Sequence, residues 1–83
     1  MSAWMNLERG ERMQIKLYEL RKKAGLTQAQ MAEIIDKSET TYRDKELGNR
    51  DFTLSEMYKI ANLLGKNIGD IFTDTTSRKV NTA

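Results

Sequence analysis

The segment from residue 26 to residue 48 constrains this chain most, because its signals predict two short helices joined by a tight turn. Thr27 followed by Gln30 is a capping box, in which each side chain binds the backbone amide of the other residue. Ser38 is a start signal for a second helix, and Gly48 supplies the left-handed residue that ends it. Both helices are therefore bounded by local signals, and little chain remains between them.

The turn between the two helices falls at Asp36 and Lys37. Apolar residues of the first helix recur at helical spacing and indicate one buried face: Met31, Ala32 and Ile35. Two short helices with such a turn form a helix-turn-helix, in which the first helix crosses the DNA backbone and the second enters the major groove. The segment therefore points to DNA binding.

Three further helices are predicted around this unit, from apolar residues at helical spacing. One runs from about residue 12 to residue 24. Another starts at Thr53, which forms a second capping box with Glu56, and a last short helix is capped by Asn67. Their apolar residues are, in order, Met13, Leu17, Leu20, Ala24; Leu54, Met57, Ile60, Ala61, Leu64; and Ile68, Ile71, Phe72. The predicted fold class is therefore all-α, with five helices and no strand.

The same pattern divides the chain into three parts. Residues 13–73 are predicted to form one helical domain, residues 1–12 a flexible leader and residues 74–83 a flexible tail. Within the leader, Trp4 either stays unattached or docks on the domain or on a partner subunit. Met13 is a second candidate translation start.

Composition excludes several classes of function. The 83 residues contain no cysteine and no histidine, which rules out thiolate metal sites and histidine-based catalysis. We therefore expect no enzyme, no metal and no cofactor. No apolar run reaches the ~18 residues of a membrane span and no signal-peptide pattern occurs, so no membrane association and a cytoplasmic location are expected. The net charge of +2 permits nucleic-acid binding without arguing for it.

An ordered set of short motifs carries a resemblance to a known family. The motifs are LR at 20–21, GLTQ at 25–28, MA at 31–32, Glu46 with Gly48, IA at 60–61 and LG at 64–65. Through them, roughly residues 13 to 73 resemble the lambda repressor/Cro-like family of bacterial and phage regulators, also called the xenobiotic response element family. The resemblance implies a five-helix lambda repressor-like DNA-binding domain, with the helix-turn-helix at its second and third helices.

Arg21 and Glu46 stand where this family has an arginine and a glutamate that form an ion pair. The resemblance therefore implies a structural pair that braces the first helix against the end of the reading helix, and not a DNA contact. The alternative is that each side chain is solvated, in which case the pair contributes little. Tyr42 stands at a core position of the family and is expected to point inward, and Thr41 partly so.

The resemblance also implies DNA contacts along the motif. The base-reading positions are Ser38, Glu39, Thr40, Arg43 and Asp44. The phosphate-binding positions are Gln28, Lys37, Lys45, Asn49 and Arg50. The Arg43 side chain suits the two acceptors of guanine, and Glu39 suits the amino group of cytosine. Asp44 is expected to orient a neighbouring cation, because a lone carboxylate beside phosphates is repelled.

Four residues depart from the usual family pattern. Asp36 replaces a glycine in a left-handed turn, which aspartate tolerates. Lys37 and Lys45 replace apolar residues, so their stems are expected to cover the core while the ammonium groups reach water, and the lost apolar filling is expected to loosen the reading helix. Phe52 replaces a proline and is expected to fill part of that gap. Residues 36–46 carry a net negative charge, which predicts weak non-specific DNA binding.

These expectations favour a sequence-specific DNA-binding transcriptional regulator. It is expected to be a repressor that binds a palindromic operator in double-stranded DNA as a homodimer, through its last helix and either end of the chain. The chain offers no room for a ligand domain, so no small-molecule ligand is expected. The alternative is a helix-turn-helix module that binds protein, as an antitoxin or as the partner of another regulator, with weak DNA binding.

Overall fold

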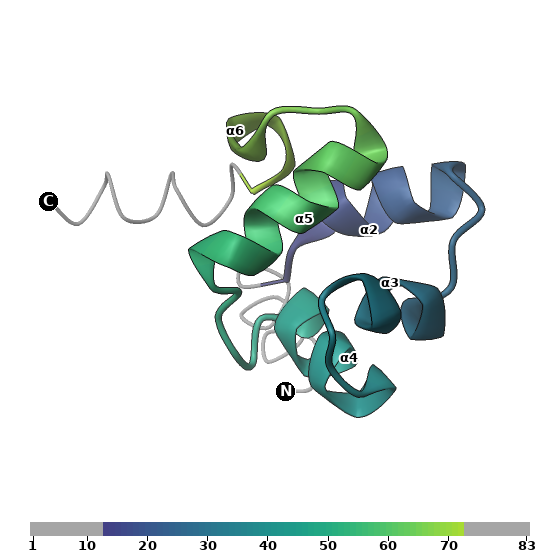
Figure 1. Ribbon diagram of the computed structural model, residues 1–83, viewed down its shortest axis with the longest axis vertical. Helices are drawn as coiled ribbons and strands as arrows, with labels where there is room; N and C mark the ends of the chain where they lie inside the picture. The colour runs from purple at the N-terminus through teal and green to yellow at the C-terminus, as the bar shows by residue number, and fades with distance from the viewer. Residues whose placement is uncertain (1–12, 73–83) are drawn as a thin grey trace, which may run out of the picture.

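The computed structural model describes residues 13–72. Over this range the chain forms five helices and no strand, so the predicted all-α class is confirmed (Figure 1). The helices are α2 (Ile15–Lys23), α3 (Gln28–Ile34), α4 (Glu39–Leu47), α5 (Leu54–Leu64) and α6 (Ile68–Ile71). Among these helices, none is long and apolar enough to cross a membrane. The expected leader and tail, with Trp4, lie outside the described residues.

Local signals start three of these helices at the predicted residues. The Thr27 hydroxyl accepts from the Gln30 amide at 3.1 Å, while the Gln30 side chain accepts from the Thr27 amide at 2.8 Å. Thr53 and Glu56 form the same capping box at the start of α5. Ser38 caps α4 by accepting from a backbone amide in its first turn. These bonds satisfy amide groups that have no partner within the helix.

Left-handed residues mark the turn of the motif and the end of α4. Asp36 has a φ of 63° and Gly48 a φ of 90°. Glycine adopts this conformation without steric cost, and aspartate is one of the few other residues that visit it routinely. The predicted turn at Asp36 and the predicted stop at Gly48 are both confirmed.

The first helix is shorter than the sequence pattern predicts. It begins only at Ile15, because Gln14 has a non-helical ψ of 77°. The Gln14 amide instead donates to the Glu46 carbonyl at 2.8 Å and joins this residue to the end of α4. Met13 therefore precedes the helix and is half-buried, while Ala24 ends the helix and is exposed. The predicted apolar stripe is wrong at these two residues and holds only between them.

Two details of the C-terminal half also differ from the prediction. The pattern assigns Leu54 to the apolar stripe of α5, but this residue is 58% exposed, because helical periodicity puts it at the edge of the stripe. Asn67 precedes α6 as predicted, yet its side chain makes no capping hydrogen bond. The start of α6 therefore depends on its packing against α2 and α5.

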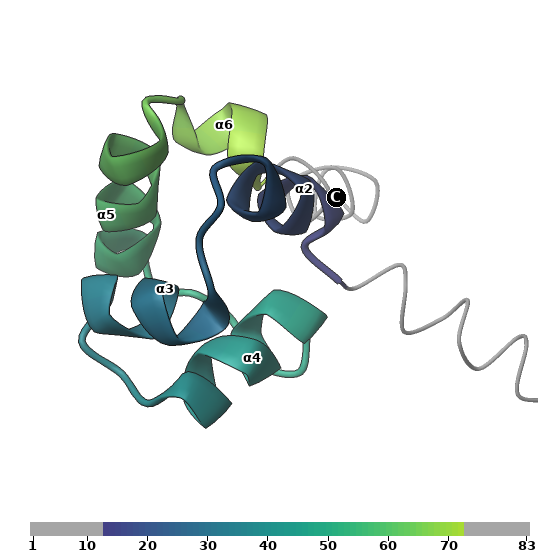
Figure 2. The ribbon, with the colours of Figure 1, turned by 90° about the vertical axis from the view of Figure 1, so that its right-hand side faces the viewer.

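The helices enclose one core and leave α4 at the outside. The fully buried hydrophobic side chains come from every helix: Leu17, Met31, Tyr42, Ile60 and Ile71, with Ile35 at the end of α3. In Figure 1, α2, α5 and α6 lie above α3 and α4. Figure 2 shows α3 between α5 and α4, in agreement with the contacts of α3 to both. The second helix of the motif therefore has a supported inner face and a free outer face.

Phe52 packs behind α4 and joins it to the end of the domain. Its ring lies edge-on to Tyr42, with centroids 5.9 Å apart, and edge-on to Phe72, with centroids 5.4 Å apart. Such edge-to-face pairs are favourable beyond the area that they bury. The prediction that Phe52 fills part of the space behind the reading helix is confirmed.

Candidate nucleic-acid interface

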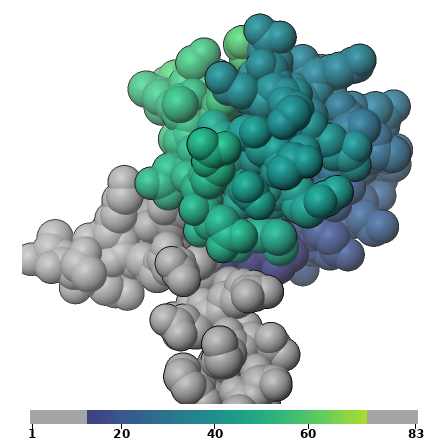
Figure 3. All heavy atoms as spheres, turned by 90° about the horizontal axis from the view of Figure 1, so that it is seen from below, coloured from purple at the N-terminus to yellow at the C-terminus, as the bar shows by residue number. Residues whose placement is uncertain are grey.

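The outer face of α4 is open to solvent. Glu39, Thr40 and Arg43 are exposed on this helix, Ser38 is exposed at its start, and Asp44 is half-buried. Figure 3 views the molecule from this side, where the teal atoms of α3 and α4 fill the middle of the surface. The fold thus presents four of the predicted base-reading residues to solvent and keeps the fifth at the margin.

The inner side of α4 holds the residues predicted to point inward. Tyr42 is fully buried and Thr41 is half-buried, so both predictions are confirmed. The Ser38 hydroxyl accepts from the Thr41 amide at 3.2 Å and donates to the Thr41 hydroxyl at 3.0 Å. Ser38 therefore has a structural role at the start of the helix.

Arg21 and Glu46 form a buried ion pair between α2 and the end of α4. Arg21 Nε donates to Glu46 Oε2 at 2.8 Å and Nη2 donates to Oε1 at 3.2 Å, a two-bond geometry that fixes both side chains. Nη1 donates to the Leu26 carbonyl at 2.9 Å. Burial lowers the pKa of Arg21, but the hydrogen bond and charge of Glu46 raise it by more. The guanidinium therefore stays charged inside the protein.

The Glu46 carboxylate also binds two further residues of the motif. Tyr42 Oη donates to Oε2 at 2.8 Å, and Gln28 Nε2 donates to Oε1 at 3.0 Å. Burial raises the pKa of Tyr42, and the charge and hydrogen bond of Glu46 raise it further, so the hydroxyl remains a donor. One side chain that is 1% exposed thus joins α2, α3 and α4.

Gln28 extends this set of hydrogen bonds to the outer face of α4. Its Oε1 accepts from Arg43 Nε at 3.4 Å, a long hydrogen bond between exposed groups. Arg43 Nη2 also lies 3.8 Å from Oε2 of Glu39, one helical turn away. Exposed pairs of this kind contribute little to stability. They influence where the guanidinium points more than they influence folding.

Lys45 is not available for the predicted phosphate contact. Its side chain is 8% exposed, and Nζ lies 2.6 Å from Glu56 Oε1 of α5. Nζ also lies 5.9 Å from the centre of the Phe52 ring. The prediction that this ammonium group reaches water is therefore wrong, because a buried carboxylate binds it. Sequence reasoning missed this role of Glu56, since the capping box already accounted for its carboxylate.

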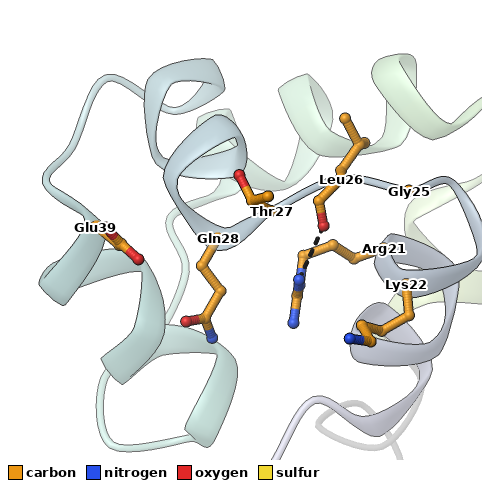
Figure 4. Close-up of a pocket in the computed structure, with 7 residues that line it drawn as sticks. All are labelled: Arg21, Lys22, Gly25, Leu26, Thr27, Gln28 and Glu39. Atoms are coloured by element: carbon orange, nitrogen blue, oxygen red, sulfur yellow. Dashed lines mark hydrogen bonds between the residues drawn. The ribbon is translucent and has the colours of Figure 1, made fainter.

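A polar hollow lies along each flank of α4. Figure 4 shows the first, into which the Lys22 and Gln28 side chains extend from α2 and α3. Glu39 also lines this hollow, whereas Thr41 lines the second. Because these two α4 residues are two positions apart, helical geometry places them on opposite sides of the helix. The complete linings are Arg21, Lys22, Gly25, Leu26, Thr27, Gln28 and Glu39 for the first hollow, and Lys37, Thr41, Lys45, Arg50 and Asp51 for the second.

Three of the predicted phosphate-binding residues other than Lys45 line these hollows. Gln28 lines the first hollow, and Lys37 and Arg50 line the second. These two cations and Asn49 are exposed. Sequence reasoning did not assign Lys22 to this surface, because a lysine in the last turn of a helix is explained by the helix dipole alone.

The chain matches the profile of a known protein family. A profile of the helix-turn-helix family matches residues 17–71, which is more than half of the sequence. The chain belongs to this family. The match runs from α2 to α6, and the resemblance to lambda repressor/Cro-like DNA-binding regulators is confirmed. Neither a curated protein nor a solved structure matches the chain.

Proposed function

We propose that this chain is a sequence-specific DNA-binding transcriptional regulator that inserts α4 into the major groove. The observation that carries the proposal is the exposed face of α4, with Glu39 and Arg43 on it and a polar hollow on each flank. The major groove of B-DNA is about 12 Å wide and admits an α-helix. A helix in that position meets base edges along its outer face and phosphate groups along both sides.

The two flanks supply the phosphate contacts of this proposal. Gln28 and Lys22 face one DNA strand from the first hollow, and Lys37 and Arg50 face the other strand from the second. Asn49, in the loop after α4, joins the second group. Contacts of this kind set the position and orientation of the protein without reading sequence.

Base reading is assigned mainly to Arg43 and Glu39. A guanidinium offers two donors that match the N7 and O6 acceptors of guanine, while a carboxylate accepts from the N4 amino group of cytosine. The two side chains lie one helical turn apart on the exposed face, so they address neighbouring base pairs. Thr40 adds a methyl group suited to thymine, and Ser38 and Asp44 lie at the margins of the same surface.

We further propose that two copies bind a palindromic operator and repress transcription from it. A two-fold dimer of such domains places its half-sites about 34 Å apart, one turn of DNA. Residues 36–46 are net negative, so a single copy binds DNA weakly and pairing raises the affinity. Contact through α6, which lies away from α4 in Figures 1 and 2, leaves the reading helix free.

The exposed carboxylates of the motif favour a second candidate function. Asp36 and Glu39 are exposed and Asp44 is half-buried, against the exposed cations Lys37 and Arg43. A surface with this balance suits a basic protein partner as well as DNA. On this alternative the chain is a protein-binding module, an antitoxin or the partner of another regulator.

Selection of random duplex DNA on the purified protein, at low and moderate salt, tests the first function. We expect a palindromic motif to be recovered. Arg43→Ala should relax the preference at one base pair of each half-site, because the bidentate contact to guanine is lost, at a cost of about 1–3 kcal/mol per contact.

Lys59→Ala is the matched control, since it removes the same charge from an exposed position of α5, outside the proposed interface. It should leave the motif unchanged. A folded protein that enriches no motif even at low salt would contradict the DNA-binding function and favour the protein-binding alternative.

A further inference from the structure

The orientation of the Gln28 side-chain amide is determined by its two neighbours. Gln28 Nε2 lies 3.0 Å from Glu46 Oε1, and Gln28 Oε1 lies 3.4 Å from Arg43 Nε. A carboxylate only accepts hydrogen bonds and a guanidinium only donates them. The amide can satisfy both neighbours in one way only, with its nitrogen inward at Glu46 and its oxygen outward at Arg43.

The two hydrogen bonds of the Gln28 amide form a bridge between Glu46 and Arg43. The inner end of this bridge is rigid. Glu46 is 1% exposed and is bound by Arg21 through two hydrogen bonds and by Tyr42 through a third. The carboxylate therefore cannot turn toward another partner without leaving buried donors unsatisfied, which is costly. Through its hydrogen bond to Gln28, the fixed carboxylate constrains where the exposed guanidinium of Arg43 lies.

We infer that Gln28 is a positioning residue for Arg43, which aims the guanidinium at the base that it reads. This inference rests on the proposed function of the α4 face. Gln28 binds Nε, so the fork of Nη1 and Nη2 can meet the two acceptors of a guanine once Nη2 leaves Glu39, from which it lies 3.8 Å in the free protein. Arginine side chains have many rotamers, and a bridge that selects one of them before binding reduces the ordering cost.

A positioning role of Gln28 differs in its effect from the phosphate contact predicted for the same residue. A phosphate contact affects all DNA sequences alike, because phosphates carry no sequence information. A positioning role acts through Arg43, so its loss should appear at the base pair that Arg43 reads and should vanish once Arg43 is truncated.

The test is a double-mutant cycle with Gln28→Met and Arg43→Ala on the selected operator and on operators changed at single base pairs. Methionine has similar length but neither a strong donor nor a strong acceptor. We expect Gln28→Met to lower discrimination at the Arg43 base pair by roughly tenfold, as expected for residues that are energetically coupled. In the Arg43→Ala background this loss of discrimination should vanish, and only the uniform loss from the proposed phosphate contact of Gln28, equal on all sequences, should remain.

Asn49→Ala provides the matched control cycle, since Asn49 is an exposed polar residue assigned to a phosphate and not to Arg43. Its effect should be the same with and without Arg43→Ala. If Gln28→Met behaves like Asn49→Ala, with equal losses on all sequences and an additive cycle, the inference is overturned.

A second measurement needs no DNA and separates this inference from the proposed function. NMR measures the hydrogen-exchange rate of the Arg43 Nε–H group in the free protein, with Arg50, which also has an exposed side chain, as internal reference. Gln28→Met should accelerate exchange at Arg43 and leave Arg50 unchanged. Unchanged exchange at Arg43 overturns the bridge. If no operator is found but the exchange rate rises, the proposed function fails while the bridge itself stands.

Discussion

Glu56 uses one carboxylate oxygen for two structural tasks. Oε1 accepts from the Thr53 amide at 2.9 Å, which caps α5, and from Lys45 Nζ at 2.6 Å, which ties α4 to α5. Burial raises the pKa of Glu56, but the hydrogen bonds from Lys45 and Thr53 and the charge of Lys45 lower it by more. The pKa of the folded state therefore lies below the ordinary value of 4.5.

This shift predicts an acid dependence of stability. Because the pKa of Glu56 is lower in the folded than in the unfolded protein, its contribution is present above the unfolded value and is lost as pH falls through the folded value. The free energy of unfolding, measured with urea between neutral and acidic pH, should fall more steeply below 4.5 in the wild type than in Glu56→Gln. Glu33→Gln, at an exposed position of α3, should follow the wild type. Equal curves for wild type and Glu56→Gln would refute this role.

At the scale of the element, α4 is attached to the rest of the domain by charge at two successive residues. Glu46 pairs with Arg21 of α2, and Lys45 pairs with Glu56 of α5. The second pair gives Lys45 a direct bond to the neighbouring helix, at a position where the sequence predicted lost apolar filling. Both pairs lie behind the exposed face and so orient it.

Removing one partner of the buried Lys45–Glu56 pair should destabilise the protein more than removing both partners. Lys45→Leu leaves the Glu56 carboxylate buried without its cation, at a cost of about 3 kcal/mol. Adding Glu56→Gln removes the unpaired charge and keeps an oxygen for the Thr53 amide, so the double variant should recover most of the loss. Urea unfolding of both variants measures this difference. A double variant no more stable than Lys45→Leu would show that the pair is not the source of the cost.

For the whole molecule, charge distribution matters more than the net charge of +2. The cations proposed to meet phosphates are Lys22, Lys37 and Arg50, and Lys45 is withdrawn from this set by its partner. Few phosphate contacts per copy make binding depend on base contacts and on pairing of two copies. The salt dependence of DNA affinity therefore measures how many of these cations contact phosphates.

The proposed interface predicts a modest salt dependence. With these three cations, the logarithm of affinity should change with the logarithm of salt concentration with a slope of about −3 per copy. Lys37→Gln should reduce the size of the slope by about 1. Lys45→Gln should leave the slope unchanged, because its ammonium group is bound to Glu56 and its side chain, although it lines the second hollow, is only 8% exposed. A reduced slope for Lys45→Gln would contradict the buried pair. Fluorescence titration on the selected operator provides the measurement.

Sequence alone was sufficient for the features that depend on near neighbours in the chain. The capping boxes at Thr27 and Thr53, the left-handed Asp36 and the stop at Gly48 each involve residues within a few positions of one another. Hydrogen bonds and backbone conformation over that distance follow directly from residue type. The helical class and the position of the motif were predictable for the same reason. The inward direction of Tyr42 was predictable through family resemblance.

Apart from the Arg21–Glu46 pair, which the family resemblance implied, only the tertiary structure decided which distant residues meet. Lys45 and Glu56 are 11 positions apart, and Gln28 and Glu46 are 18 apart. A lysine has many carboxylates within its reach in an unfolded chain, and residue type does not choose among them. The choice depends on how α3, α4 and α5 pack. Packing also buried Lys45 and oriented the Gln28 amide, because a desolvated polar group must find a partner inside the fold.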